Sequence, residues 1–205
     1  MSPLEQLLYE SCKKINVELN EKQISQFMDY KDMLLEWNEK MNLTAITDER
    51  EIMLKHFADC LMICSDLNLD GKKVIDVGTG AGFPGVPVKI ACPGAEMTLL
   101  DSLNKRINFL KELSEKLGLE NVDCVHMRAE DGGADKNLRD SFDLCISRAV
   151  ANLAVLSEYC LPFVRVGGTF ISMKGPDVEE EVNEAKKAIK VLGGEIKAIK
   201  KMEIP

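Results

Sequence analysis

The sequence predicts an α/β fold, in which a mostly parallel, doubly wound sheet follows an N-terminal helical cap. From residue 73 onward, strand-like apolar runs alternate with segments of helical periodicity, which is typical of a parallel sheet with helices on both faces. Before residue 71 the apolar residues recur only at helical spacing. We therefore expect a helical cap over residues 1–70 and an α/β domain over residues 71–205.

Three helices are expected in the cap. The first begins near Leu4, and the second follows Asn20, whose side-chain oxygen can cap it. Residues 42–44, Asn-Leu-Thr, should end the second helix. The third should begin after Thr47 or Asp48, because either residue can act as its N-cap.

The α/β domain should contain five strands and four helices before its last segment. Strands are expected at residues 73–77, 96–101, 121–127, 142–147 and 164–173. Helices are expected at residues 84–92, 103–118, 151–161 and 177–192, with Gly118 ending the second of them. Residues 195–204 resemble one more strand.

The amino-acid composition argues against some classes of protein and favours others. The 34 acidic and 26 basic residues give a net charge of −8, which argues against a protein that coats nucleic acid by bulk charge but permits a local basic site. The seven cysteines form no C-x-x-C pair and mostly lie in apolar runs, as reduced thiols of a cytoplasmic protein do. The sequence shows neither a signal peptide nor a membrane-spanning stretch.

The segment DVGTGAGFPG at residues 76–85 is the strongest indication of function. Gly78, Gly80 and Gly82 can adopt positive φ and let a ligand approach the backbone. The helix that follows should point free N–H groups at that ligand. The next strand ends in Asp101, 21 residues after Gly80, where nucleoside-binding α/β units place a carboxylate on the ribose.

Two cofactors fit this segment. Gly80, Gly82 and Gly85 satisfy the dinucleotide pattern G-x-G-x-x-G. The same segment also satisfies D-x-G-x-G-x-G, which resembles the first motif of class I S-adenosylmethionine methyltransferases. Asp76 favours the methyl donor, because its amino-acid end carries an ammonium group, whereas a pyrophosphate gains nothing from a carboxylate. A glycine-rich turn without a ligand is the remaining alternative.

Polar residues also follow the other strands and should meet at one edge of the sheet. Arg148 directly follows an apolar strand, and its charge cannot stay buried without a partner. It could bind the carboxylate of the donor or an RNA phosphate, or it could form a salt bridge with Asp59 or Glu158. Lys174 is placed similarly, and Asn42 lies in the loop between cap and sheet.

Other catalytic chemistry finds little support. We expect neither His56 nor His126 to be catalytic, and the sequence contains no cluster with the spacing of metal ligands. A dehydrogenase that uses NAD needs a residue to relay a proton beside the nicotinamide, and no good candidate is present. A nucleotide-sensing module without catalysis is a third hypothesis.

Several segments together resemble the bacterial 16S ribosomal RNA guanine-N7 methyltransferases, the RsmG or glucose-inhibited division protein B family. They are MNLTAITD at 41–48, HFADCL at 56–61, DVGTGAGFPG at 76–85, LLDSLNKRINFLKEL at 99–113, RAED at 128–131, ISRAVANL at 146–153 and GGTFISMKG at 167–175. The resemblance implies a class I, Rossmann-like methyltransferase fold and methyl transfer from S-adenosylmethionine to N7 of one guanosine in 16S ribosomal RNA.

The resemblance also implies roles for individual residues. Donor contacts would come from Gly78, Phe83, Asp101, Ser102, Leu103, Ala129, Glu130 and Arg148, in addition to Asp76 and Gly80, which the glycine-rich segment itself indicates. Within that set Asp101 would hold the ribose, Ala129 and Glu130 would meet the adenine, and Arg148 would lie at the methionine end. Arg148, Asn42 and Lys174 are the candidate catalytic residues. Family members usually continue with a final strand and a basic tail, which this sequence, ending at Pro205, lacks. We expect a monomer that binds 16S ribosomal RNA.

Overall fold

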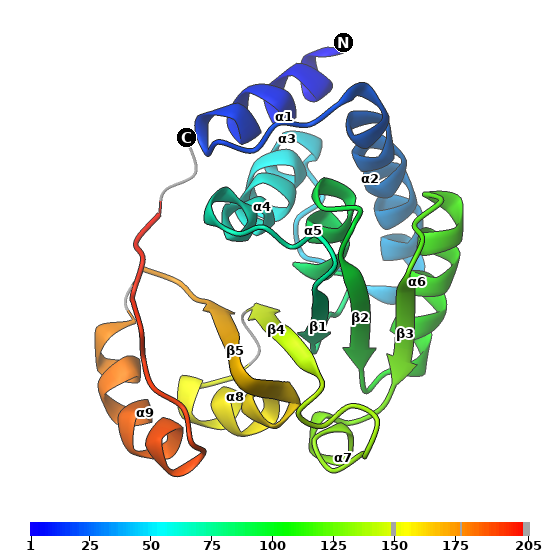
Figure 1. Ribbon diagram of the computed structural model, residues 1–205. Coiled ribbons are helices and arrows are strands. Elements are labelled where there is room, and N and C mark those ends of the chain that lie inside the picture. The colour runs from blue at the N-terminus through cyan, green and yellow to red at the C-terminus, as the bar shows by residue number, and fades with distance from the viewer. Residues whose placement is uncertain (149–150, 177, 203–205) are drawn as a thin grey trace.

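The computed structural model describes residues 1–148, 151–176 and 178–202, and these residues form one parallel sheet with helices on both faces (Figure 1). The strand order is β3-β2-β1-β4-β5, and every neighbouring pair is parallel. The strands are β1 (Lys73–Val77), β2 (Glu96–Asp101), β3 (Val122–His126), β4 (Phe142–Arg148) and β5 (Val164–Met173). All five expected strands are confirmed, with bounds that differ by at most one residue at either end.

The helices of the cap cover one face of the sheet together with two helices of the α/β domain. The cap helices are α1 (Pro3–Lys14), α2 (Glu21–Met41), α3 (Glu49–Glu51), the π-helical segment η1 (Ile52–Ala58), α4 (Asp59–Leu61) and the 3-10 segment η2 (Met62–Asp66). The two helices of the α/β domain are α5 (Gly85–Ala91) and α6 (Asn104–Lys116). Asn20 and Asp48 accept the expected capping hydrogen bonds from Gln23 and Glu51. Asn42 ends α2 with a φ of +50°. The π-helical turn was not expected from the sequence.

The opposite face carries the remaining helices. They are α7 (Ala129–Gly132), α8 (Leu153–Cys160), the 3-10 turn η3 (Leu161–Phe163) and α9 (Glu179–Val191). The two faces divide the alternating residues of the strands, so that Val74 packs in the larger core with the cap while Ile75 packs in the core beneath α8. The larger core joins the cap and the sheet without a break, because Phe27, Phe57 and Val86 belong to one cluster. No helix in the described ranges is long and apolar enough to cross a membrane.

The strand expected at residues 195–204 is wrong over its described part, residues 195–202. This segment leaves α9 and runs toward the cap (Figure 1), where Lys200 Nζ lies 2.5 Å from Asp66 Oδ2. Lys201 forms an ion pair with Glu179. A strand needs a neighbour to accept its backbone hydrogen bonds, and this route takes the segment away from β5.

Candidate active site

The loop between β1 and α5 has the backbone that its glycines predicted. The φ angles of Gly78, Gly80 and Gly82 are +72°, +62° and +99°. The N–H groups of Gly78 and Thr79 both donate to the carbonyl oxygen of Leu100, at 2.9 and 3.1 Å. These bonds hold the loop against the end of β2, so the glycine-rich segment and Asp101 lie together.

The glycines of this segment serve different purposes. A Cβ on Gly80 would find no atom closer than 4.0 Å, so this position faces open space. A Cβ on Gly82 would lie 2.7 Å from Val86 Cγ2 and 2.8 Å from the Tyr30 hydroxyl. A Cβ on Gly85 would lie 2.8 Å from Asp76 Oδ2. Gly82 and Gly85 are therefore required for packing, and of these three only Gly80 leaves room for a ligand.

The buried side chain of Asp76 stabilises the loop through hydrogen bonds. Its carboxylate is fully buried, and Oδ2 accepts hydrogen bonds of 2.7 Å from both the Thr79 hydroxyl and the Gly85 N–H. Burial raises the pKa of Asp76 to about 7, although those hydrogen bonds act in the opposite direction. The Gly85 N–H donates to Asp76, and the Val86 N–H donates to the carbonyl oxygen of Gly82. The expectation that the start of α5 offers free N–H groups to a ligand is therefore wrong.

One atom of Asp76 remains without a partner. Its Oδ1 is buried and makes no hydrogen bond to any described residue. A buried carboxylate oxygen of this kind is costly unless a donor reaches it. An ammonium group or a water molecule beside the loop would supply that donor, which is consistent with the amino-acid end of S-adenosylmethionine.

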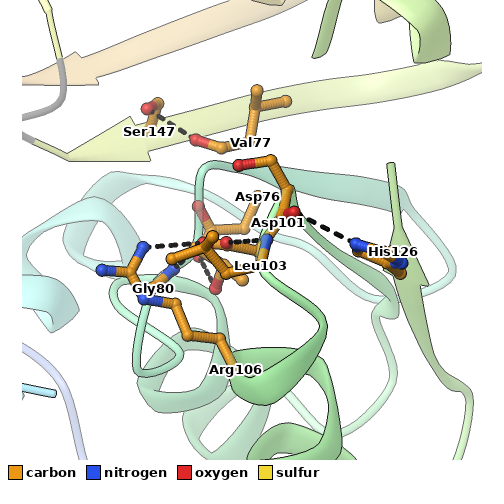
Figure 2. Close-up of polar contacts among 10 residues, drawn as sticks. Asp76, Val77, Gly80, Asp101, Leu103, Arg106, His126 and Ser147 are labelled. Atoms are coloured by element: carbon orange, nitrogen blue, oxygen red, sulfur yellow. Dashed lines mark hydrogen bonds and ion pairs between the residues drawn. The ribbon is translucent and has the colours of Figure 1, made fainter. Parts of the chain in front are cut away.

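Asp101 ends β2, and Figure 2 shows its hydrogen bonds to Gly80, Leu103 and Arg106. Its Oδ2 accepts from the Gly80 N–H at 2.9 Å and from Arg106 Nη1 at 3.3 Å, and its Oδ1 accepts from the Leu103 N–H at 2.9 Å. A carboxylate has about four acceptor sites, so these bonds leave capacity for a ribose hydroxyl. The contact with Arg106 is the longest of the three and the easiest to exchange. Two adjacent turns thus fix the carboxylate before any ligand arrives.

The surface next to Asp101 is open. Leu103 is 51% exposed, although it is apolar, and Ser102 is exposed with its carbonyl oxygen 3.0 Å from His126 Nε2. Ala129 and Glu130 begin α7 immediately beyond β3, the strand beside β2. These four predicted donor residues therefore follow neighbouring strand ends on one edge of the sheet.

Arg148 is held by the cap. Its Nη1 donates to Asp59 Oδ2 and to the carbonyl oxygen of Lys55, each at 3.1 Å. Its guanidinium lies 4.9 Å from the centre of the Phe83 ring. Of the alternatives left open by the sequence, the salt bridge with Asp59 is present. The side chain therefore joins the end of β4 to the cap and to the glycine-rich loop.

His56 completes this cluster, a position that the sequence analysis did not anticipate. Its Nδ1 lies 3.0 Å from Arg148 Nη2, and its Nε2 lies 2.8 Å from the Thr44 hydroxyl. Because arginine only donates, Nδ1 accepts and the Nε2–H group donates to Thr44. Burial and the charge of Arg148 lower the pKa of His56 to about 4. The neutral ring stacks on Phe83 with centroids 4.4 Å apart.

The two other candidate catalytic residues have structural partners or roles. Lys174 donates to the carbonyl oxygen of Ala151 and to Glu181 Oε1, the latter at 2.6 Å, so it links the end of β5 to α9. Asn42 is exposed and terminates α2 in the left-handed conformation. Their catalytic roles stay predictions. Nowhere in the described ranges do three or more His, Cys, Asp or Glu side chains group as metal ligands.

The strand order, the glycine-rich loop and the acid at the end of β2 define the class: the protein has the class I S-adenosylmethionine-dependent methyltransferase fold. The fold is similar to that of a ribosomal protein L11 methylase from Lactobacillus delbrueckii subsp. bulgaricus, with a TM-score of 0.57 and 17% identity over 73% of this chain and 74% of that one. It is also similar to a SAM dependent methyltransferase from Aquifex aeolicus, with a TM-score of 0.53 and 19% identity over 74% and 86% of the two chains.

Sequence comparison then gives the family. The family model described as GidB, rRNA small subunit methyltransferase G, matches residues 23–205, and the chain belongs to this family. A Ribosomal RNA small subunit methyltransferase G from Clostridium perfringens (strain 13 / Type A) is 55% identical over 97% of this chain and 83% of its own length. A relative of the same name from Alkaliphilus oremlandii is 57% identical over 94% of this chain and 81% of its own length.

Proposed function

We propose that this protein transfers the methyl group of S-adenosylmethionine to N7 of a specific guanosine in 16S ribosomal RNA. The observation that carries the proposal is the pairing of Gly80 with Asp101 in a member of this family. A glycine with open space beside it and a prearranged carboxylate are what a nucleoside needs. We further propose that the protein acts as a monomer in the cytoplasm, where its RNA substrate is made.

The proposed donor contacts follow the edge of the sheet. Residues 78–83 would lie along the amino-acid end, with Asp76 Oδ1 available to the ammonium through water or directly. Asp101 would accept from the ribose hydroxyls, and Leu103 with Ser102 would lie beside the sugar and base. Ala129 and Glu130 would meet the adenine. The fit is supported by the open space at Gly80 and by the exposure of Leu103.

Methyl transfer to N7 of guanine needs little help from acidic or basic side chains. N7 of guanine carries an in-plane lone pair and no proton, so its attack on a methyl group needs no general base. The bound donor supplies an electrophilic methyl on a sulfonium. The residues of the protein would align the two reactants and exclude water, which is where the rate enhancement would arise. A neutral His56, unable to donate a proton readily at pH 7, is consistent with that demand.

Arg148 would act at the methionine end of the donor through its position beside Phe83. The two terminal nitrogens of its guanidinium group already contact Asp59 and His56, so Arg148 would also keep the cap in place over the loop. Asn42 and Lys174 are proposed to contact the target nucleotide. For Lys174 this requires release from Glu181 when RNA binds.

Two measurements test the proposal. Isothermal titration should show binding of S-adenosylhomocysteine and none of NAD, and the reverse result would favour a dehydrogenase. Radiolabelled S-adenosylmethionine should then label unmethylated 16S ribosomal RNA, with the modified base located by mass spectrometry. Binding of S-adenosylhomocysteine without transfer to naked RNA or to small ribosomal subunits would favour the nucleotide-sensing module. The Asp101→Ala variant is the control for both measurements.

A further inference from the structure

Two partly buried cysteines lie side by side, away from the proposed donor site. Cys64 belongs to η2, Cys92 is the C-cap of α5, and their sulfur atoms are 3.8 Å apart. Both side chains are partly exposed. The pair therefore connects the last turn of the cap with the end of the helix that follows the glycine-rich loop.

Cys92 can be reached by a small solute. It lines a surface groove of about 260 Å³ between residues 67–70 and residues 91–94. A molecule that enters the groove therefore comes close to Cys92, whose sulfur is 3.8 Å from that of Cys64.

The two thiols differ in their ease of ionisation. The hydrogen bond between them and burial raise the pKa of Cys64, whereas the same hydrogen bond and the nearby charge of Lys89 lower the pKa of Cys92. Cys92 is therefore the thiol of the pair that ionises more readily, and the thiolate is the form that attacks a disulfide.

We propose that Cys64 and Cys92 are a reactive dithiol that small disulfides oxidise to an intramolecular disulfide. The Cys92 thiolate attacks one sulfur of the small disulfide, forms a mixed disulfide and releases one small thiolate. Cys64 then loses its proton and attacks Cys92 Sγ, which releases the second small thiolate. Two protein thiols are oxidised and one small disulfide is reduced to two thiols, so atoms and electrons balance.

A second pair of thiols in the protein provides an internal comparison. Cys145 and Cys160 are also hydrogen bonded to each other, but both are fully buried. They are a neighbouring pair like the first one but lack its access to solvent. We therefore expect the folded protein to oxidise at Cys64 and Cys92 while Cys145 and Cys160 stay reduced.

The experiment uses the full, reduced chain and oxidised glutathione as the probe. After incubation, free thiols are alkylated and the intact and digested protein is examined by mass spectrometry, with circular dichroism to verify folding. The wild type should lose two hydrogen atoms and yield a cross-link between Cys64 and Cys92. Fragment spectra must assign the bond, because Cys60 lies in the same tryptic peptide as Cys64.

Three variants separate the two roles. Cys64→Ser should accumulate glutathione on Cys92, because nothing can resolve the mixed disulfide. Cys92→Ser should react with glutathione at least about tenfold more slowly than Cys64→Ser. Cys124→Ser is the matched control, since Cys124 is partly exposed like Cys64 and Cys92 but belongs to neither pair, and it should oxidise as the wild type does. The proposal is overturned if wild type and Cys64→Ser hold equal glutathione on Cys92, or if Cys145 and Cys160 oxidise first.

Discussion

Asp101→Asn gives a direct test of the donor site, because it exchanges one oxygen for nitrogen and removes the charge. Both oxygens of Asp101 accept from a backbone N–H, one from Gly80 and the other from Leu103, each at 2.9 Å. In either orientation the new amide nitrogen faces one of these donors. The change therefore breaks one internal hydrogen bond, worth about 1 kcal/mol, and weakens the acceptor available to a ribose.

The effect on affinity follows from these bonds. A hydrogen bond to a charged group contributes about 1.5–3 kcal/mol, so S-adenosylhomocysteine should bind Asp101→Asn about 10- to 150-fold more weakly than the wild type. In the Asn variant the side-chain NH₂ group faces a backbone N–H group, so two donors oppose each other. We therefore expect this variant to bind S-adenosylhomocysteine no more tightly than Asp101→Ala does, with dissociation constants that agree within about threefold. Isothermal titration measures both variants, and thermal unfolding verifies that they are folded. An Asn variant that retains wild-type affinity would refute the assignment of Asp101 to the ribose.

Three further predictions concern the loop and the cluster around it. Gly82→Ala should lower the free energy of unfolding by about 1–3 kcal/mol more than Gly80→Ala does, because only the former overpacks its surroundings; equal losses in urea denaturation would contradict the division of roles. Arg148→Lys leaves Nδ1 of His56 unpaired, so it should cost about 1–3 kcal/mol of stability and reduce methyl transfer, and wild-type values in both assays would remove Arg148 from the site. His56 has a folded pKa of about 4, below its unfolded value of 6.5, so its contribution to stability is complete above pH 6.5 and is lost as the pH falls toward 4. Asp76, with a folded pKa of about 7 against 3.8, contributes stability that is complete below pH 3.8 and is lost as the pH rises through 7. His56→Phe and Asp76→Asn should therefore change the pH dependence of the free energy of unfolding in opposite directions. Profiles of the two variants that run parallel to each other would contradict these pKa shifts.

The sequence predicted the sheet well for a physical reason. A buried parallel strand is a short apolar run between turn signals, and β1, β2 and β4 are such runs, buried over most of their length. The segment after α9 has similar residues but no neighbouring strand in the described structure, and composition alone does not reveal whether a partner exists. The π-helical turn η1 was missed because a helical pattern does not distinguish one helix type from another.

The site was predicted in part. Asp101 and Gly80 were found because their spacing follows from the βαβ unit itself, and the hydrogen bond between them agrees with that spacing. His56 was missed because it meets Arg148 across 92 residues of chain, and no local pattern encodes such a contact. The salt bridge of Arg148 with Asp59 was one of several alternatives, since the sequence shows that a buried charge needs a partner but not which one it finds.

The contacts between cap and loop have a consequence for the cooperativity of unfolding. The Tyr30 hydroxyl donates to the carbonyl oxygen of Ala81 at 2.5 Å, and Arg148 ties the same loop to η1. Loosening α2 or η1 therefore frees the loop at once, and the loop cannot open without exposing aromatic residues of the shared core. Amide protons in α2, η1 and α5 should accordingly exchange with solvent as one unit, in a single sub-global opening. Although the sequence predicts a cap and an α/β domain as separate regions, we then expect neither to have an unfolding transition of its own.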